Sequence, residues 1–329
     1  MDKIGIIGAG AWGTALAATA RRAGRAVVLW AHEPEVAAAI AATGRNDSYL
    51  PGIALDPGIE TTTDLARATD ADAVLLVTPA QHLGAVCAAA AAHWRAGVPA
   101  VICAKGIEQG SGRMMSEVVE ATLPQAPLAV LSGPTYAIEV ARGLPTAVTL
   151  AATDRNLGAR LVEALGTATF RPYLSTDVVG AEIGGAVKNV LAIACGIVEG
   201  KGYGDNARAA LITRGLAELA RLAAARGGRP ETAMGLSGLG DLILTASSVQ
   251  SRNYSLGLAL GQGRALADIL AGRRAVTEGV WSAGAVVAMA DRLGVEMPIA
   301  AAVDAVLNRA LPLDEAIARL LSRPFRAEA

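Results

Sequence analysis

The chain has 329 residues, more than one hydrophobic core usually serves, so two domains of roughly 150 residues each are expected. Its 29 Lys and Arg nearly balance its 30 Asp and Glu, which argues against a broad basic surface for nucleic acid or anionic lipid. Hydrophobic residues make up 53% of the chain but aromatic residues only 3%, so the interior must be built from closely packed alanine, valine, leucine and isoleucine.

Short β-rich runs alternate with alanine-rich helical stretches up to about residue 178. The runs lie at residues 3–10, 26–32, 73–79, 100–106, 128–134 and 146–152. Continuous apolar strands separated by helices are typical of a parallel sheet covered by helices on both faces. We therefore predict an α/β domain over residues 1–178, built on a Rossmann-like, doubly wound sheet.

A second pattern follows the segment 170–180, beyond which the strand signals stop. From Glu182 onward the sequence has helical periodicity with glycine breaks, which predicts an all-α domain over residues 179–329. One apolar run in it, 183–198, is short for a bilayer and contains Lys188. We therefore expect no membrane insertion.

The remaining bulk features indicate a reducing compartment. The N-terminus leads directly into an apolar strand, without the charged and then apolar run of a signal peptide, so we expect a cytoplasmic protein. Cys87, Cys103 and Cys195 are widely spaced within apolar runs, which is typical of small core residues; metal or disulfide use is the alternative. No metal-ligand spacing is visible, so we expect no metal site.

Residues 8–13 read GAGAWG, a GxGxxG pattern placed after a predicted strand and at the opening of a predicted helix. Gly8 permits the tight turn, Gly10 lets the backbone approach a pyrophosphate, and Gly13 lets helix and strand pack closely. The helix N-terminus then faces the anion. A glycine turn that binds nothing is the alternative, but the strand and helix around it favour a dinucleotide-binding domain.

The residues after the second predicted strand do not choose between NAD and NADP. Glu33 could accept hydrogen bonds from the adenosine ribose hydroxyls and favour NAD. His32 and Arg45 would instead suit a 2′-phosphate, and a solvated turn explains Glu33 equally well. The cofactor is therefore predicted as NADP or NAD.

Lys188 is a lone cation in the apolar segment 181–200. On a helix it shares a face with Gly184 and Gly185, one turn earlier, which would leave a hollow without side chains beside its stem. A charged tip in an apolar hollow needs a partner. From this segment alone, Lys188 could equally reach water or pair with a structural carboxylate.

Further polar residues follow apolar segments and are candidates to converge with Lys188. Lys105 ends a predicted parallel strand, where open α/β sheets bind ligands, and Thr135 follows the next one. Asp241 comes after three glycines, and the triplet 251–253 supplies a hydroxyl, a guanidinium and an amide. Singly, these groups are explained as a surface lysine, turn residues, helix caps and a solvated arginine. Beside a nucleotide loop, they suit a phosphate and a small polyol.

The chain resembles the bacterial-type NAD(P)-dependent glycerol-3-phosphate dehydrogenases over nearly its entire length. The motifs that carry this resemblance are, in chain order, GAGAWG, NDSYLPG, AKG, SGPT, IGGAVKN, NARAALITRGLAE, GLGDLILT, QSRN, VTEG and EMPI. The sequence departs from the family's usual pattern at Ala246, Ser237 and residues 281–283. These departures affect the expected packing but not the expected chemistry.

The resemblance implies a Rossmann domain followed by a helical domain, with the active site between them. It implies reduction of dihydroxyacetone phosphate to sn-glycerol 3-phosphate, a precursor of phospholipids, and a homodimer. The implied catalytic residues are Lys188, as general acid/base, and Asp241. The implied substrate-binding residues are Lys105, Gly133, Thr135, Lys188, Asp241, Ser251, Arg252 and Asn253. The implied cofactor-binding residues are Gly8, Gly10, Ala11, Trp12, Gly13, His32, Tyr49, Lys105, Ala137, Arg252, Val276 and Glu278.

On this hypothesis, the Lys188 ammonium delivers a proton to the carbonyl oxygen while the cofactor carries the hydride, and Asp241 orients the amine and tunes its pKa. Two rivals are a β-hydroxyacid or acyl-CoA dehydrogenase and a nucleotide-sensing protein without turnover. The first would need a carboxylate clamp or a CoA channel, and His82 and His93 are better explained as surface or satisfied residues than as catalytic ones. The second would not require Lys188 together with Asp241 and a phosphate-binding turn.

Overall fold

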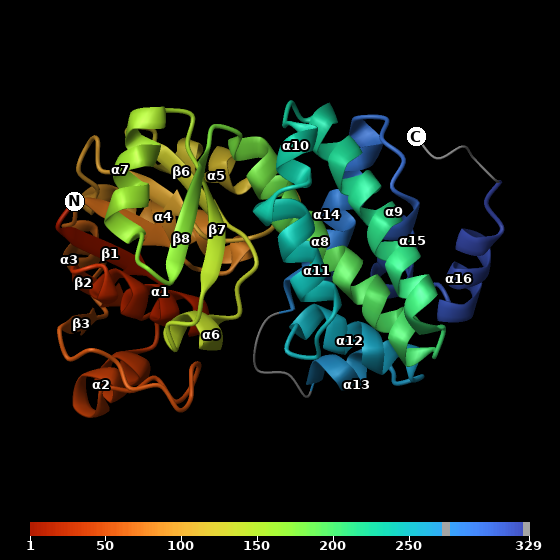
Figure 1. The fold of residues 1–329 in the computed structure, drawn as a ribbon, viewed down its shortest axis with the longest axis horizontal. Helices are drawn as coiled ribbons and strands as arrows, with labels where there is room; N and C mark the ends of the chain where they lie inside the picture. The colour runs from red at the N-terminus through yellow and green to blue at the C-terminus, as the bar shows by residue number, and fades with distance from the viewer. Residues whose placement is uncertain (272–276, 325–329) are drawn as a thin grey trace.

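The computed structural model describes residues 1–271 and 277–324, which form two domains that lie side by side (Figure 1). The N-terminal domain contains one eight-stranded sheet with the strand order β3-β2-β1-β4-β5-β6-β7-β8. The strands are β1 Lys3–Ile7, β2 Ala26–Trp30, β3 Ile59–Thr62, β4 Ala73–Leu76, β5 Ala100–Ile102, β6 Leu128–Ser132, β7 Thr146–Ala151 and β8 Phe170–Ser175. The predicted strand runs at 3–10, 26–32, 73–79, 100–106, 128–134 and 146–152 each contain one of these strands, and the Rossmann-like fold class is confirmed.

Helices cover the two faces of this sheet, because each face is lined by buried aliphatic side chains that form a separate core cluster. The helices are α1 Ala11–Arg22, α2 Pro34–Thr43, α3 Leu65–Thr69, α4 Leu83–Ala90, α5 Met115–Thr122, α6 Ala137–Ala141 and α7 Arg155–Leu165, with short 3-10 turns η1 Ala80–His82 and η2 Ala91–His93. Aliphatic and alanine side chains fill both clusters, as the low aromatic content predicts.

The sheet is not wholly parallel, contrary to the expectation from the sequence. β6 and β7 pair antiparallel, whereas the other neighbours in the sheet pair in parallel. The connection between them contains only α6, a helix of five residues. A parallel crossover must carry the chain back along the full sheet, usually on a longer helix, so this short connection returns the chain in the opposite direction.

Strand β3 was absent from the predicted runs. Its sequence is IETT, and it lies at the edge of the sheet, where it pairs only with β2. Only Ile59 of its four residues is buried, so it lacks the continuous apolar run by which the central strands are found.

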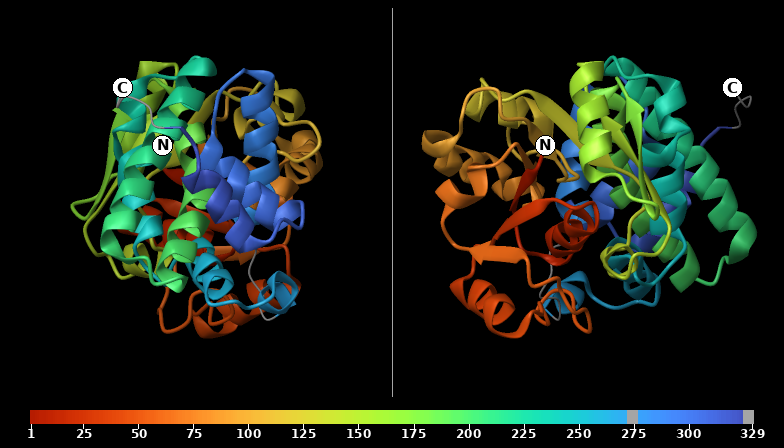
Figure 2. Two further views of the ribbon diagram at one scale, coloured as in Figure 1. Left: turned by 90° about the vertical axis from the view of Figure 1, so that its right-hand side faces the viewer. Right: turned by 60° about the vertical axis from the view of Figure 1, so that its left-hand side comes forward.

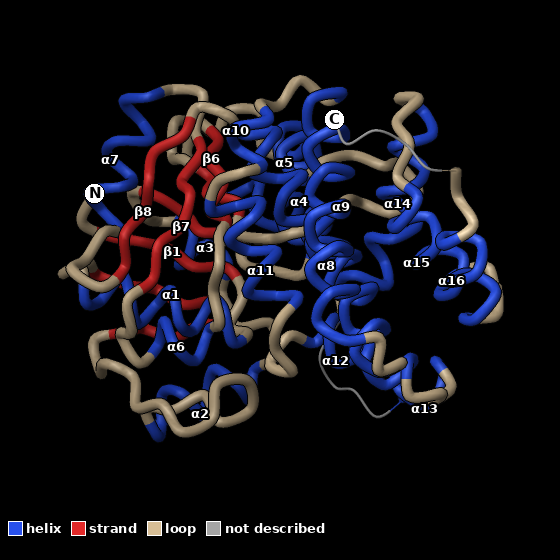
Figure 3. The backbone as a smooth tube through the Cα atoms, turned by 45° about the vertical axis from the view of Figure 1, so that its right-hand side comes forward, coloured by secondary structure: helices blue, strands red, loops and turns tan. Residues whose placement is uncertain are grey.

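The C-terminal domain is helical throughout its described residues, and Figure 3 places all the strands in the other domain. Its helices are α8 Val178–Gly200, α9 Gly204–Ala225, α10 Pro230–Ala233, α11 Asp241–Ala246, α12 Arg252–Gly261, α13 Leu266–Ala271, α14 Glu278–Arg292, α15 Pro298–Asn308 and α16 Leu313–Leu321, with the π-helix η3 Leu236–Gly240 before α11. Figure 2 shows the two domains from two further sides, and in its left view these helices lie in front of the sheet domain.

Helix α8 runs through the centre of the helical domain and is covered on all sides. It packs unusually close to α12, because a Cβ atom at Gly196 would lie 2.1 Å from the Tyr254 carbonyl oxygen and one at Gly257 would lie 2.0 Å from that of Ile193. α8 is the one helix in the described part of the chain with the length and hydropathy of a membrane span, and its most apolar 18-residue window is wholly buried inside the protein. Its apolar surface therefore serves the core of this domain.

Candidate active site

The glycine turn between β1 and α1 leaves the first turn of α1 open. Gly8 has a φ of +121°, and a Cβ atom there would lie 2.9 Å from the Val77 backbone, so this turn requires glycine. Gly10 caps α1 without a side-chain hydrogen bond, and a Cβ atom at Gly10 would meet nothing within 4 Å. The N–H groups at the start of α1 are therefore free to bind an anion that approaches over Gly10.

Two residues implied in cofactor binding lie near the carboxyl end of β2. The exposed His32 ring lies 5.8 Å from the Trp30 ring, centroid to centroid. Tyr49 comes from a later loop, and its hydroxyl donates a 2.7 Å hydrogen bond to the Glu33 carboxylate, which raises the pKa of Tyr49. The Arg45 Nε forms an ion pair with Asp47 Oδ2 at 3.2 Å. Neither NAD nor NADP is selected by these contacts.

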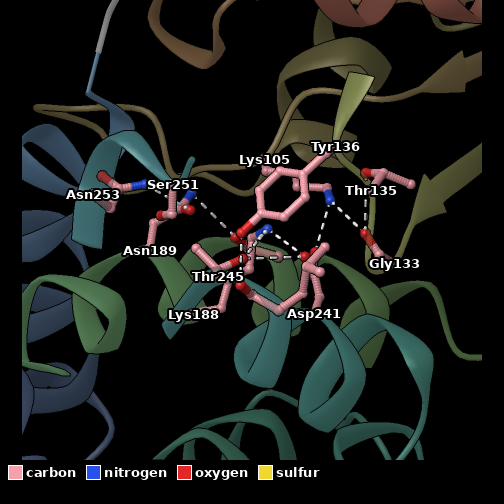
Figure 4. Close-up of polar contacts among 12 residues, drawn as sticks. Lys105, Gly133, Thr135, Tyr136, Lys188, Asn189, Asp241, Thr245, Ser251 and Asn253 are labelled. Carbon is pink, nitrogen blue, oxygen red and sulfur yellow. Dashed lines mark hydrogen bonds and ion pairs between the residues drawn. The ribbon is translucent and has the colours of Figure 1, made fainter. Parts of the chain in front are cut away.

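Lys188 and Asp241 are brought together at the junction of the two domains (Figure 4). The Lys188 Nζ donates to Asp241 Oδ1 at 2.5 Å and to the Thr245 hydroxyl at 3.0 Å. The Lys105 Nζ donates to Asp241 Oδ2 at 2.7 Å and to the Gly133 carbonyl at 3.0 Å. One carboxylate therefore bridges two lysines, one from each domain.

Burial dominates the electrostatics of this cluster. Asp241 is 0% exposed and Lys188 is 7% exposed. Desolvation lowers the pKa of Lys188 to about 7, assisted by the nearby Lys105 charge and opposed by Asp241. Lys188 can therefore exchange a proton near neutral pH, which is the property required of a general acid/base.

The glycines before Lys188 do not leave a hollow, contrary to the expectation from the sequence. A Cβ atom at Gly184 would lie 2.4 Å from the Ser237 carbonyl oxygen, and one at Gly185 would lie 3.2 Å from the Lys105 Cγ. Glycine is needed at 184 because η3 packs directly on the α8 backbone. This contact brings the start of α11, and with it Asp241, to Lys188.

The triplet 251–253 begins α12 beside this cluster. The Ser251 hydroxyl caps α12 by accepting from the Tyr254 N–H at 3.2 Å, so its explanation as a helix cap is confirmed. The Asn253 amide donates to Asn189 Oδ1 and accepts from the Gly279 N–H, each at 2.9 Å, and so links α8, α12 and α14.

The other implied site residues have separate locations. Thr135 donates to the Gly133 carbonyl at 3.2 Å, and Ala137 begins α6 directly after that turn. Glu278 begins α14; its burial raises its pKa, and the Arg252 charge opposes this shift. Val276 lies outside the described residues.

Comparisons with known proteins cover both domains. The family model described as NAD-dependent glycerol-3-phosphate dehydrogenase N-terminus matches residues 3–158, and its C-terminal counterpart matches residues 177–318. A relative from Rhodospirillum rubrum named glycerol-3-phosphate dehydrogenase, NAD(P)+, is 65% identical over 329 residues, which cover 100% of this chain and 94% of that relative. A relative of the same name from Caulobacter vibrioides is 61% identical over 328 residues, covering 100% of this chain and 99% of the relative.

The chain belongs to the NAD-dependent glycerol-3-phosphate dehydrogenase family. A solved structure agrees: glycerol-3-phosphate dehydrogenase from Coxiella burnetii is 40% identical and superposes with a TM-score of 0.94, covering 98% of this chain and 99% of that one. Lys105 lies in the N-terminal matched region and Asp241 in the C-terminal one, so their ion pair joins the two family domains at the cluster described above.

Two residues of this candidate site were not predicted from the sequence. Thr245 contacts Lys188, and its position four residues after Asp241 on a helix was a usable signal, because such residues share a face. Tyr136 donates a 2.7 Å hydrogen bond from the N-terminal domain to the Leu244 carbonyl in α11, a contact for which no local pattern exists. Within the described residues, no group of His, Cys, Asp and Glu has the arrangement of a metal site.

Proposed function

We propose that this chain is an NAD(P)-dependent dehydrogenase that reduces dihydroxyacetone phosphate to sn-glycerol 3-phosphate. The observation that carries the proposal is the Lys188 ammonium, buried between two domains that both match this family and hydrogen-bonded to Asp241 and Thr245. Reduction of a ketone needs a proton donor beside the carbonyl oxygen, and Lys188 is the group whose pKa suits that task near neutral pH.

The residues of the β1–α1 turn fit a dinucleotide. The start of α1 is uncapped and the space over Gly10 is open, both of which a pyrophosphate requires. The buried Trp12 Nε1 in the same turn has no hydrogen-bond partner among the described residues, which is rare in the absence of a ligand. We assign the cofactor to Gly8, Gly10, Ala11, Trp12, Gly13, His32, Tyr49, Lys105, Ala137, Arg252, Val276 and Glu278. When bound, the reduced nicotinamide supplies the hydride.

The substrate would be held by cations and polar groups from both domains. We assign its phosphate to Lys105 and the triplet 251–253, and its polar contacts to the turn with Gly133 and Thr135. With Lys188 and Lys105 protonated, the two amines around one carboxylate leave a surplus positive charge, which attracts an anionic substrate.

Lys188 would act as the general acid. Its ammonium donates a hydrogen bond to the carbonyl oxygen, which polarises the carbon, and then transfers a proton to that oxygen as the alcohol forms. In the reverse direction its neutral amine accepts the alcohol proton. Asp241 keeps the amine oriented and favours its protonated form.

The family resemblance supports further proposals. We propose that the domains divide after residue 178, close to the start of α8 at Val178. We also propose a cytoplasmic location, a homodimer and a role in supplying the glycerophospholipid backbone.

The test is the loss of NADH or NADPH absorbance when the protein is mixed with dihydroxyacetone phosphate, oxaloacetate or acetoacetyl-CoA. We expect turnover with dihydroxyacetone phosphate and none with oxaloacetate or acetoacetyl-CoA. Turnover with either of the other two would favour a β-hydroxyacid or acyl-CoA dehydrogenase, and cofactor binding without any turnover would favour a nucleotide sensor.

A further inference from the structure

Asn46 joins the glycine turn to the loop between α2 and β3. Its side chain is buried, with 2% exposure. The Asn46 Nδ2 donates one hydrogen bond to the Ala9 carbonyl and one to the Thr14 hydroxyl, each at 2.8 Å. Ala9 lies inside the glycine turn and Thr14 lies in the first turns of α1. A single amide therefore holds the turn on both sides of the point where α1 begins.

The glycine turn has few other means of being held. Gly8, Ala9 and Gly10 carry no polar side chains, and a second hydrogen bond to the Ala9 carbonyl, from the Thr14 hydroxyl, is long at 3.4 Å. The Ala9 C=O and the Gly10 N–H share one rigid peptide plane and point in opposite directions. Fixing the carbonyl therefore fixes the direction of the N–H group at the entrance to α1.

The backbone of Asn46 also holds the segment that carries Tyr49. Its carbonyl accepts from the Leu50 N–H at 2.7 Å and from the Tyr49 N–H at 3.3 Å. The Tyr49 hydroxyl in turn reaches Glu33 after β2. Asn46 thus couples two segments, the glycine turn and the loop at the end of β2.

We propose that Asn46 is a positioning residue for the dinucleotide, which sets the glycine turn and the Tyr49 segment in the geometry that binds the cofactor. The inference rests on the proposed function, since it concerns the same cofactor. A carbonyl oxygen only accepts hydrogen bonds, so the nitrogen of the Asn46 amide must face Ala9. An aspartate of the same shape would instead place an oxygen against that carbonyl and a negative charge beside the phosphate-facing turn.

The experiment compares Asn46→Ala and Asn46→Asp with the unaltered protein. Dissociation constants for NADH and NADPH are measured by titration calorimetry without substrate, and the KM for dihydroxyacetone phosphate is measured at saturating cofactor. We expect Asn46→Ala to weaken cofactor binding about 5-fold, as loss of one or two neutral hydrogen bonds does. We expect Asn46→Asp to weaken it at least ~10-fold, because repulsion is added to that loss. The KM should stay within about 2-fold of the unaltered value.

Asn156→Asp is the matched control, because Asn156 is exposed on α7 and gains the same charge away from the turn. Its cofactor affinity should not change. Unchanged cofactor affinity in Asn46→Ala would overturn the inference. An equal loss of cofactor and substrate affinity would also overturn it, because it would indicate that the whole protein is loosened. If Asn46→Asp does not fold, Asn46→Ala decides. Failure of the unaltered protein to bind either cofactor would instead overturn the proposed function, and the inference with it.

Discussion

Lys188 is a buried amine. The negative charge beside it is too small to stabilise its ammonium form fully. Asp241 is its one carboxylate contact among the described residues, and Asp241 also accepts from Lys105. Desolvation of a buried cation costs several kcal/mol, and a shared carboxylate offsets only part of it. The pKa of Lys188 therefore falls to about 7, whereas the half-buried lysine at the C-cap of the same helix, Lys201, has a pKa raised by its hydrogen bond to Asp314.

Replacing Lys188 by alanine should reduce kcat for dihydroxyacetone phosphate at least ~100-fold, because the general acid is lost. NADPH binding, followed by fluorescence, should persist, since the glycine turn is untouched. Lys201→Ala is the control, because it removes an amine from the C-terminal end of α8. Near-normal turnover in the Lys188 variant would end its catalytic assignment.

The pH dependence of reduction should follow the protonation of Lys188. The acid must carry its proton, so kcat should fall as the pH rises through about 7. Asp241 favours the charged amine, so Asp241→Asn should lower the pKa of Lys188 and move this fall to lower pH. The measurement is a kcat profile at saturating substrate and cofactor. An unshifted profile would show that Asp241 does not tune the amine.

Helix α11 carries Asp241 and Thr245 but is only six residues long. Such a short helix gains little stability from its own hydrogen bonds, so its orientation depends on contacts made by its ends. At its start, Asp241 is held by the two lysines. Near its end lies the Leu244 carbonyl, one of the last four in the helix, which have no partner within the helix itself. This carbonyl accepts a hydrogen bond from the Tyr136 hydroxyl of the other domain.

Removing the Tyr136 hydroxyl should therefore loosen α11 without changing the cofactor site. We expect Tyr136→Phe to lower kcat/KM for dihydroxyacetone phosphate about 3- to 10-fold, the range for one lost hydrogen bond. The dissociation constant of NADPH should be unchanged. Tyr173→Phe, on the exposed part of edge strand β8, is the control. Equal kinetics in the two variants would contradict this role.

The two domains are joined by buried polar contacts as well as by the site itself. The Glu182 carboxylate on α8 accepts from the Ser116 N–H at 2.8 Å and from its hydroxyl at 2.6 Å, at the start of α5 in the N-terminal domain. Beside it, Glu117 of α5 pairs with Arg226 after α9 at 2.7 Å. Burial raises the pKa of Glu182 to about 7 in spite of the Ser116 hydrogen bonds.

This raised pKa predicts how stability depends on pH. Between the ordinary glutamate pKa of about 4.5 and about 7, the unfolded chain releases the Glu182 proton while the folded chain keeps it, so the contribution of Glu182 to stability falls as pH rises. Glu182→Gln should abolish this loss, which amounts to at most about 3 kcal/mol. Urea unfolding from pH 4.5 to 7.5 measures it. Glu163→Gln, exposed on α7, should keep the unaltered slope, and an unaltered slope in the Glu182 variant would refute the assignment.

Much of the architecture was predictable from local patterns. Continuous apolar runs locate the central strands because both faces of those strands are buried, and the GAGAWG turn lies where its strand and helix require it. β3 was not predicted because only one of its four residues is buried, so its sequence has no apolar run. The reversed direction of β7 was not predicted because the direction of a strand depends on how it pairs with its neighbour, which no single segment encodes.

The order of elements, the glycine turn and the presence of one amine in an apolar helix could be read along the chain, since periodicity and residue type report local burial and backbone freedom. The partners of that amine could not. Thr245, Tyr136 and Asn46 acquire their roles only when segments distant in sequence pack together. The pKa of Lys188 likewise depends on how completely packing removes water and on which charges it leaves nearby, so it exists only in the folded molecule.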